Sequence, residues 1–180
     1  MMLRPTQSLE AEPLRMAEQE ALELAGYASR FEQTDLSGDR VERGAFAGSL
    51  ISQAGPLPML YNHQTDTPIG VWDEAFEDET GLFVRGRLFL GTPEADRAAR
   101  LIASGSVSGL SIGFRTQRFA ARADGGRNLF DLELWEVSIV AFPMLPSARL
   151  TEIGSDMAPG STPPDDNIQL PQANEITRSL

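Results

Sequence analysis

Ser106-Val-Ser-Gly-Leu-Ser-Ile-Gly-Phe114 places three serines beside glycines at the beginning of a predicted buried strand. A second segment, Leu60-Tyr-Asn-His-Gln64, contains the only histidine among the 180 residues, and the chain has no cysteine. Nucleophilic hydrolysis at a serine requires a neighbouring base. A hydrolase built from this chain would therefore use a serine, and His63 is the only imidazole base available to it.

The composition is that of one acidic, soluble domain with tails. A length of 180 residues suits a single ordinary domain. The net charge of −11 argues against nucleic-acid binding, which depends on clustered Lys and Arg. No apolar run reaches the ~20 residues of a membrane span, so no membrane association is expected. The absence of cysteine excludes disulfides and thiol nucleophiles, and we expect neither a cofactor nor a metal.

The chain divides into three parts. Residues 1–22 form an acidic arm, either a weakly amphipathic helix after Pro13 that includes Ala21 and Leu22, or a disordered segment. Residues 23–150 form the folded domain. Residues 151–180 contain four prolines and no sustained periodicity, which predicts a disordered tail.

Within the domain, apolar alternation and turn residues predict strands more often than helices. The predicted strands are 24–31, 67–72, 81–90, 110–119 and 129–142, with a short apolar run at 59–61. An acidic turn is expected at 74–80, and Asp124-Gly-Gly126 predicts a hairpin turn. Short helices are expected within 41–52 and after Thr92, where a capping Thr precedes Pro93. The fold class is therefore mainly β with two or three short helices.

Ser111 is the candidate nucleophile, because Gly109 and Gly113 on either side allow a substrate carbonyl to approach the backbone closely. Ser106 and Ser108 are rival nucleophiles. The alternative is that Ser111 is a small residue in a strand where glycines permit bulges. Gly-Leu-Ser-Ile-Gly also matches the Gly-x-Ser-x-Gly elbow of other hydrolases, but that elbow requires a following helix, which is not predicted here.

Glu136 is the candidate acid that orients the histidine, because it stands in an otherwise apolar strand between Trp135 and Val137. A buried carboxylate requires a partner, and a Ser–His pair uses an acid in this role. Asp131 and Asp66 are the alternatives. The alternative is that this face of the strand is solvated, and that Glu136, like Glu133 and Asp131, is a surface residue of the same sheet.

Six segments in register resemble the prohead maturation proteases of tailed bacteriophages, which are distantly similar to herpesvirus assemblins. The resemblance covers residues 24–150 and is carried by Gly38-Asp-Arg-Val-Glu-Arg-Gly-Ala-Phe46, Leu60-Tyr-Asn-His63, Pro68-Ile-Gly70, Gly81-Leu-Phe-Val84, Gly109-Leu-Ser-Ile-Gly-Phe114 and Glu136-Val-Ser-Ile-Val140.

This resemblance implies a serine endopeptidase with a small closed or partly open β-barrel of the assemblin type. Its histidine falls on His63 and its nucleophile on Ser111. Assemblins use a second histidine as third member; this chain has none, so Glu136 replaces it or the site is a dyad. The oxyanion would be held by backbone N–H groups near Gly113 or Arg115.

The resemblance also implies partners and a location. Such an enzyme works inside the assembling procapsid, in the host bacterial cytoplasm, and cleaves scaffold protein, the major capsid protein and itself. Self-cleavage is expected within 151–180, and a homodimer is a further expectation. The sequence does not separate a phage from a prophage or a gene transfer agent.

Two alternatives from other functional classes are left open. One is a capsid-assembly or scaffolding protein that keeps the fold without the activity. The other is a small β-barrel that binds a peptide or ligand along its glycine-rich strands.

Overall fold

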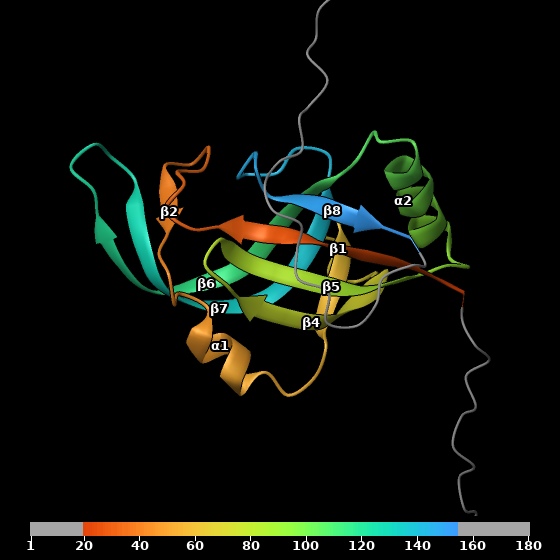
Figure 1. Cartoon of the computed structure of the whole chain (residues 1–180), viewed down its shortest axis with the longest axis horizontal. Coiled ribbons are helices and arrows are strands. Elements are labelled where there is room, and N and C mark those ends of the chain that lie inside the picture. Colours follow the sequence, from red (N-terminus) through yellow and green to blue (C-terminus); the bar gives the residue numbers. More distant parts are fainter. Residues whose placement is uncertain (1–19, 155–180) are drawn as a thin grey trace, which may run out of the picture.

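Strand β6 (Gly109–Ala121), which begins within the 106–114 segment and contains Ser111, pairs antiparallel along its length with β7 (Arg127–Val140). The connection between them holds Gly125 and Gly126 at φ of 88° and 77°, a backbone conformation that glycine adopts without steric cost. The predicted hairpin at Asp124-Gly-Gly126 is thus confirmed. In the computed structural model, which describes residues 20–154, the tip of this hairpin projects beyond the rest of the domain (Figure 1).

The remaining strands complete a barrel. They are β1 (Ala21–Arg30), β2 (Asp39–Val41), β3 (Leu57–Tyr61), β4 (Gly70–Glu77), β5 (Gly81–Phe89) and β8 (Arg149–Ile153). The order β7-β3-β4-β5-β1-β8-β6 is closed by the β6–β7 pairing, and β2 extends the sheet beside β7. Closure removes the unpaired edges of a sheet. The predicted fold class, a mainly β domain with a small barrel, is confirmed.

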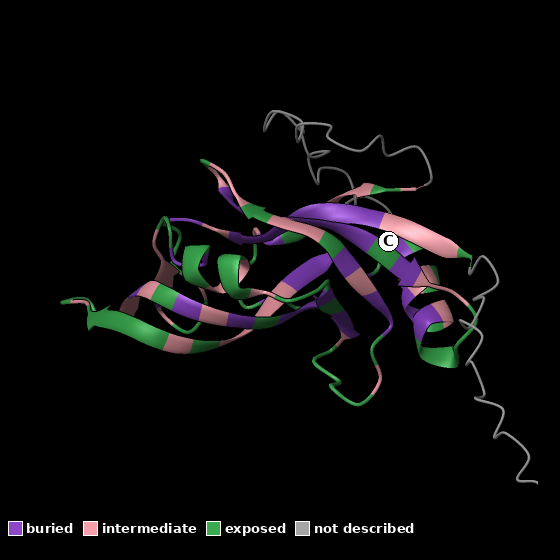
Figure 2. Ribbon diagram, turned by 90° about the horizontal axis from the view of Figure 1, so that it is seen from below, coloured by how far each residue is buried: buried purple, intermediate pink, exposed green. Residues whose placement is uncertain are grey.

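The barrel interior is filled by alternate side chains of the strands, because successive side chains on a strand point to opposite faces. Figure 2 shows the buried residues concentrated along the strands and exposure at the hairpin tip and loops. Trp72 is 1% exposed, and its indole N–H donates to the carbonyl of Val137 at 3.0 Å. Fully buried residues from five strands include Leu24, Met59, Leu82, Leu88, Leu110 and Leu132.

Two helices cover parts of the described domain, α1 (Ala47–Ser52) and α2 (Pro93–Ala103). The predicted start of α2 is confirmed, since the Thr92 hydroxyl accepts a hydrogen bond from the backbone N–H of Ala95 at 3.3 Å. Its buried side chains are Ala95, Ala98 and Ile102. None of the helices in residues 20–154 is long and apolar enough to cross a membrane.

Helix α1 is shorter than the predicted 41–52 segment. Val41 belongs to β2 and pairs with Leu129 of β7, so the chain is extended where the helix was expected to begin. Phe46 is fully buried just before the helix, whereas Ile51 within the helix is 87% exposed. Helix α1 is too short to bury both Phe46 and Ile51, the apolar residues near its two ends.

The acidic segment at 74–80 was predicted as a turn, and this is wrong for its first half. Strand β4 continues through Glu77, with Ala75 and Phe76 paired to Val84 and Phe83 of β5. The turn is confined to the next residues. There the Asp78 carboxylate accepts hydrogen bonds from the N–H groups of Thr80 and Gly81 at 2.7 and 2.9 Å.

Both predicted domain boundaries lie inside strands. Ala21 and Leu22 were expected on a helix face, but they belong to β1, where they pair with Phe89 and Leu88. Residues 151–153 were assigned to a disordered tail, but they belong to β8, where Ile153 pairs with Leu24. Long-range pairing overrides the weak local pattern of both segments. The rest of the predicted arm and tail, 1–19 and 155–180, lies outside the described residues.

Candidate active site

Strand register brings three distant segments to one place. β3 runs parallel to β7, with Leu60 opposite Ser138 and Tyr61 opposite Ile139, so the chain leaves β3 one residue beyond the Ser138 pair. On the other side of β7, β6 places Ser111 opposite Ser138. Glu136 lies two residues before Ser138 and therefore on the same face of β7. The register thus brings His63, Ser111 and Glu136 together.

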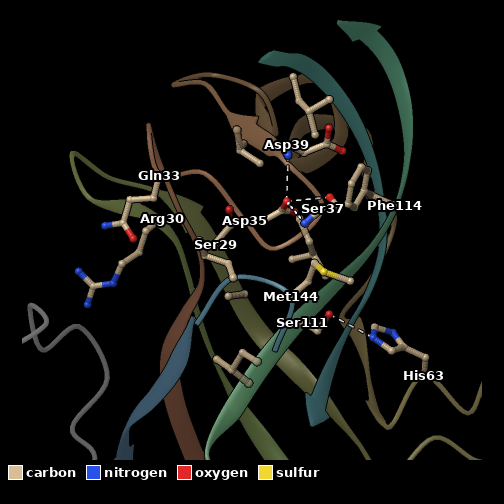
Figure 3. Close-up of a pocket in the computed structure, with 16 residues that line it drawn as sticks. Ser29, Arg30, Gln33, Asp35, Ser37, Asp39, His63, Ser111, Phe114 and Met144 are labelled. Carbon is tan, nitrogen blue, oxygen red and sulfur yellow. Dashed lines mark hydrogen bonds between the residues drawn. The ribbon is translucent and has the colours of Figure 1, made fainter. Parts of the chain in front are cut away.

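The three side chains form a continuous hydrogen-bonded line. His63 Nε2 lies 3.1 Å from Ser111 Oγ, and His63 Nδ1 lies 2.6 Å from Glu136 Oε1. Figure 3 shows the His63 ring and the Ser111 hydroxyl directed toward each other. A carboxylate only accepts hydrogen bonds, so Nδ1 carries the proton and Nε2 accepts the Ser111 hydroxyl proton. This arrangement has the hydroxyl–imidazole–carboxylate order of a nucleophilic triad.

A tight backbone turn aims the His63 ring. Asn62 and His63 have φ of 51° and 59°, in the left-handed region that non-glycine residues seldom adopt. The turn is held by β7: the N–H of Asn62 donates to the Ile139 carbonyl at 3.1 Å, and the N–H of His63 donates to Ser138 Oγ at 3.0 Å. Backbone strain of this kind persists where the surroundings hold it, and it clusters at functional sites.

The Glu136 carboxylate is held from both sides. Its side chain is 10% exposed, and the Ser138 hydroxyl donates to Oε2 at 2.7 Å while Oε1 faces His63. Gly113 lies opposite Glu136 in the β6–β7 ladder, and a Cβ at Gly113 would overlap Oε1. The carboxylate therefore occupies the space that the missing side chain leaves.

The contacts of Ser138, and the space that Gly113 leaves for Glu136, were not predicted from the sequence. Alternation along β7 does place Ser138 on the face of Glu136, and Gly113 follows Ser111 by two residues. Neither the alternation along β7 nor the spacing of Gly113 from Ser111 shows that Ser138 Oγ forms hydrogen bonds with both Glu136 and the backbone of His63. That contact depends on the turn at Asn62-His63, which comes from a separate part of the chain.

The surroundings of His63 stabilise its charged form more than water does. The hydrogen bond to Glu136 raises the pKa of His63 above its usual value of 6.5, and the negative charge of Glu136 adds to this rise, while partial burial opposes it. Glu136 thus stabilises the imidazolium that forms when Nε2 takes a proton.

The rival serines have other partners. Ser106 Oγ is 2.5 Å from Ser104 Oγ, in the segment that follows α2. Ser108 Oγ accepts a hydrogen bond from Arg149 Nη1 at 3.0 Å. Of the three candidate serines, Ser111 is the one whose hydroxyl lies within hydrogen-bond distance of His63.

The rival acids also lie elsewhere. Asp66 accepts a 3.4 Å hydrogen bond from its neighbour Thr67. Asp131 is exposed and lines a shallow polar hollow with Ser49 and Ser52 of α1. Glu133 is paired with Arg115, whose Nη2 donates to it at 2.5 Å. In residues 20–154, no three His, Cys, Asp or Glu side chains are grouped so as to hold a metal ion.

Comparison with known sequences gives relatives from bacteriophages. A family model described as caudovirus prohead serine protease matches residues 8–162. The prohead protease of Enterobacteria phage HK97 is 36% identical over 137 residues, which are 72% of this chain and 59% of that protein. The capsid polyprotein of Pseudomonas phage PAJU2 is 34% identical over 107 residues, 56% of this chain and 16% of that protein. The chain thus spans well under two thirds of the length of these curated relatives.

Comparison with solved structures gives viral proteases. The protease of Kaposi's sarcoma herpesvirus, bound to a hexapeptide phosphonate inhibitor, has a TM-score of 0.54 and 17% identity over 76% of this chain and 66% of that one. The bacteriophage T4 capsid assembly protease gp21 has a TM-score of 0.54 and 12% identity over 67% of this chain and 81% of that one. At such identities the similarity is one of fold, and it confirms the assemblin-type barrel.

Proposed function

The chain belongs to the family of caudovirus prohead serine proteases, and from this premise we propose that it is a serine endopeptidase of capsid maturation. Its catalytic residues would be Ser111 as nucleophile, His63 as general base and Glu136 as the acid that orients His63. The observation that carries the proposal is the line of contacts at 3.1 and 2.6 Å from hydroxyl to imidazole to carboxylate.

Acylation follows from this line. Ser111 Oγ attacks the carbonyl carbon of the scissile peptide bond, and His63 Nε2 takes the hydroxyl proton. The imidazolium is stabilised by Glu136 through Nδ1–H. When the C–N bond breaks, His63 gives the proton to the leaving amine, and an ester links the new carboxyl group to Ser111. Backbone donors for the oxyanion near Gly113 or Arg115 stay a prediction.

Deacylation uses the same groups in a second cycle. His63 Nε2 removes a proton from water, the hydroxide attacks the ester carbonyl, and Ser111 leaves with the proton returned by His63. Ser138 assists both cycles as a positioning residue, since its hydroxyl contacts the Glu136 carboxylate and the His63 backbone. No metal or cofactor takes part in this scheme.

The proposed substrates are proteins of the procapsid. The names of the relatives support this, since one is a prohead protease and the other a capsid polyprotein that matches over 16% of its length. We propose that the chain acts inside the assembling procapsid on the major capsid protein or scaffold, and that it also cleaves itself. A homodimer stays a prediction.

An alkyl fluorophosphonate, which esterifies activated serines, tests the proposal. Full-length protein should be labelled at Ser111, as peptide mass spectrometry would identify, and Ser111→Ala and His63→Ala should lose the label. Ser106→Ala and Ser108→Ala are matched controls that should keep it. Absence of labelling in the folded wild-type protein would instead favour a capsid-assembly protein or a binding module of the same fold.

A further inference from the structure

A cavity of about 280 Å³ opens beside the proposed catalytic pair, and His63 and Ser111 both line it (Figure 3). Its other walls come from β1, β2, the segment between them, the root of the β6–β7 hairpin and the loop after β7. The two bounding loops are joined where the N–H of Leu36 donates to the carbonyl of Met144 at 2.9 Å. The cavity is thus a built part of the fold that begins at the nucleophile.

The walls of this cavity are predominantly apolar. The apolar residues of the lining include Val41, Ile112, Phe114, Leu129, Met144 and Leu145. Figure 3 shows the Met144 side chain between Ser111 and Ser37. An apolar concave site beside a few polar groups is the usual form of a ligand pocket.

Several of the polar groups around the cavity have partners within the protein, and the guanidinium of Arg30, which also lines it, lies 4.7 Å from the centroid of the Tyr27 ring. Asp35 Oδ1 accepts hydrogen bonds from the Ser37 hydroxyl and N–H and from the Asp39 N–H, at 2.7 to 2.9 Å. The Asp39 carboxylate is 8% exposed and forms an ion pair with Arg127. Gln33 accepts a hydrogen bond from Ser147 at 2.5 Å. A charged ligand group that entered the cavity would lose its hydration. Asp35 and Asp39 would not compensate for this loss, because both carboxylates already have partners.

The size of the cavity indicates which side chains it can hold. An apolar cavity of roughly 150 Å³ is large enough for a benzene molecule. At about 280 Å³, this cavity has room for Leu, Met or Phe, and an Ala methyl would leave most of it unfilled. Unfilled apolar space forfeits the dispersion contacts that a larger side chain makes.

We propose that this cavity binds the side chain of the substrate residue whose carbonyl Ser111 attacks, and that it selects a large apolar residue such as Leu, Met or Phe. This inference rests on the proposed peptidase function. A side chain begins two bonds from its own carbonyl carbon, so a residue attacked by Ser111 has its Cβ at the opening of the cavity. Cleavage would therefore follow large apolar residues.

Diphenyl phosphonates of N-acylated amino acids test the preference without a known cleavage site. The Ser111–phosphorus bond forms, one phenoxide leaves, and His63 takes the hydroxyl proton. We would measure second-order labelling rates of the full-length protein with the Ala, Leu, Phe, Lys and Glu analogues. The Leu and Phe analogues should react at least tenfold faster than the other three, because one methylene in an apolar pocket changes rates by roughly 10–200-fold.

Met144→Glu places a carboxylate at the cavity wall and should reduce the Leu and Phe preference at least tenfold. Phe142→Glu is the matched control: it lies in the same loop, is 93% exposed and does not line the cavity. It should keep the wild-type preference. An alkyl fluorophosphonate, which has no amino-acid side chain, should label the wild type and Phe142→Glu at similar rates. Its labelling rate with Met144→Glu is measured in parallel, and the phosphonate rates of that variant are divided by it.

The outcomes separate this inference from the proposed function. If the fluorophosphonate labels Ser111 but the five phosphonates react equally, or Ala, Lys or Glu reacts fastest, the inference is overturned and the peptidase stands. Retention of the wild-type preference by Met144→Glu would also overturn it. If the fluorophosphonate labels none of the proteins, the proposed function itself fails.

Discussion

Ser138 is the residue on which the candidate site converges. It is fully buried, it accepts from the His63 N–H, and it donates to the second oxygen of Glu136. One hydroxyl thus fixes both the acid and the backbone of the base. A hydrogen bond to a charged group contributes about 1.5–3 kcal/mol, so its loss has a measurable effect.

Ser138→Ala should lower kcat by roughly 10–100-fold, which corresponds to about 1.4–2.7 kcal/mol, and should leave KM nearly unchanged. The reason is that the variant misplaces Glu136 and His63 but leaves the substrate cavity intact. Steady-state kinetics on a cleavable peptide measures both constants. Ser108→Ala, which loses a hydrogen bond to Arg149 only, is the control and should retain activity. Equal kcat for Ser138→Ala and wild type would refute a positioning role.

The pH dependence of activity should report the contact between His63 and Glu136. His63 works as a base only when neutral, so kcat/KM should rise with pH through a pKa above 6.5, because Glu136 raises it. In Glu136→Gln the amide carries no charge, so the acid limb should move to lower pH. The plateau should fall by up to about 10⁴-fold because the tautomer is no longer fixed. An unchanged plateau would indicate that His63 and Ser111 act as a dyad.

At the scale of elements, the β6–β7 ladder is what holds the acid in place. Gly113 faces Glu136 across the ladder, and the carboxylate fills the space beside its Cα. Gly113→Ala should therefore displace Glu136 and lower kcat at least tenfold, which kinetics would show, while the circular dichroism spectrum stays that of the wild type. Gly48→Ala on α1 is the control, since its Cβ would meet nothing closer than 3.9 Å. Full activity in Gly113→Ala would mean that Glu136 is dispensable.

The Trp72 indole ties β4 to β7 across the barrel, and its removal should cost stability. Trp72→Phe leaves the Val137 carbonyl without this donor, so the free energy of unfolding should fall by about 1–3 kcal/mol in urea titration. Trp135→Phe is the matched control, because Trp135 is 54% exposed. Its effect should stay within about 0.5 kcal/mol. Similar values for both variants would contradict a structural role for the buried hydrogen bond.

The helices and strands also differ in how well local sequence predicts them. The start of α2 is encoded by Thr92 and Pro93, which act on their own helix end, and this prediction is confirmed. Strand β8 and the first residues of β1 have no strong local pattern. They are strands because each pairs with a distant segment, which an argument from neighbouring residues does not include.

At the scale of the whole molecule, self-processing gives a direct test of the proposed activity. Purified wild-type protein should shorten on incubation, with cleavage within residues 151–180, because that segment is polar, proline-rich and close in sequence to the end of the barrel. Intact mass measurement would follow the change. Ser111→Ala should stay at full length under the same conditions. Equal shortening of wild type and Ser111→Ala would indicate a contaminating protease.

The residue types in the chain limit the chemistry that this protein can perform. One histidine, no cysteine and a serine between glycines restrict a hydrolytic site to few combinations, and apolar alternation predicts most of the strands. These properties are local, because they depend on residue type and on the period of side chains along the chain. His63, Ser111 and Glu136 could therefore be proposed as candidate site residues from the sequence.

How these residues come together depends on the folded barrel. The left-handed turn at Asn62 and His63, the contacts of Ser138 and the apolar cavity beside Ser111 each join segments that lie far apart in the sequence. The register of the strands determines which of these segments become neighbours. That register depends on the burial of side chains and the pairing of strands throughout the barrel. A shift of one residue between β6 and β7 would move Ser111 to the other face, with no change in any local pattern.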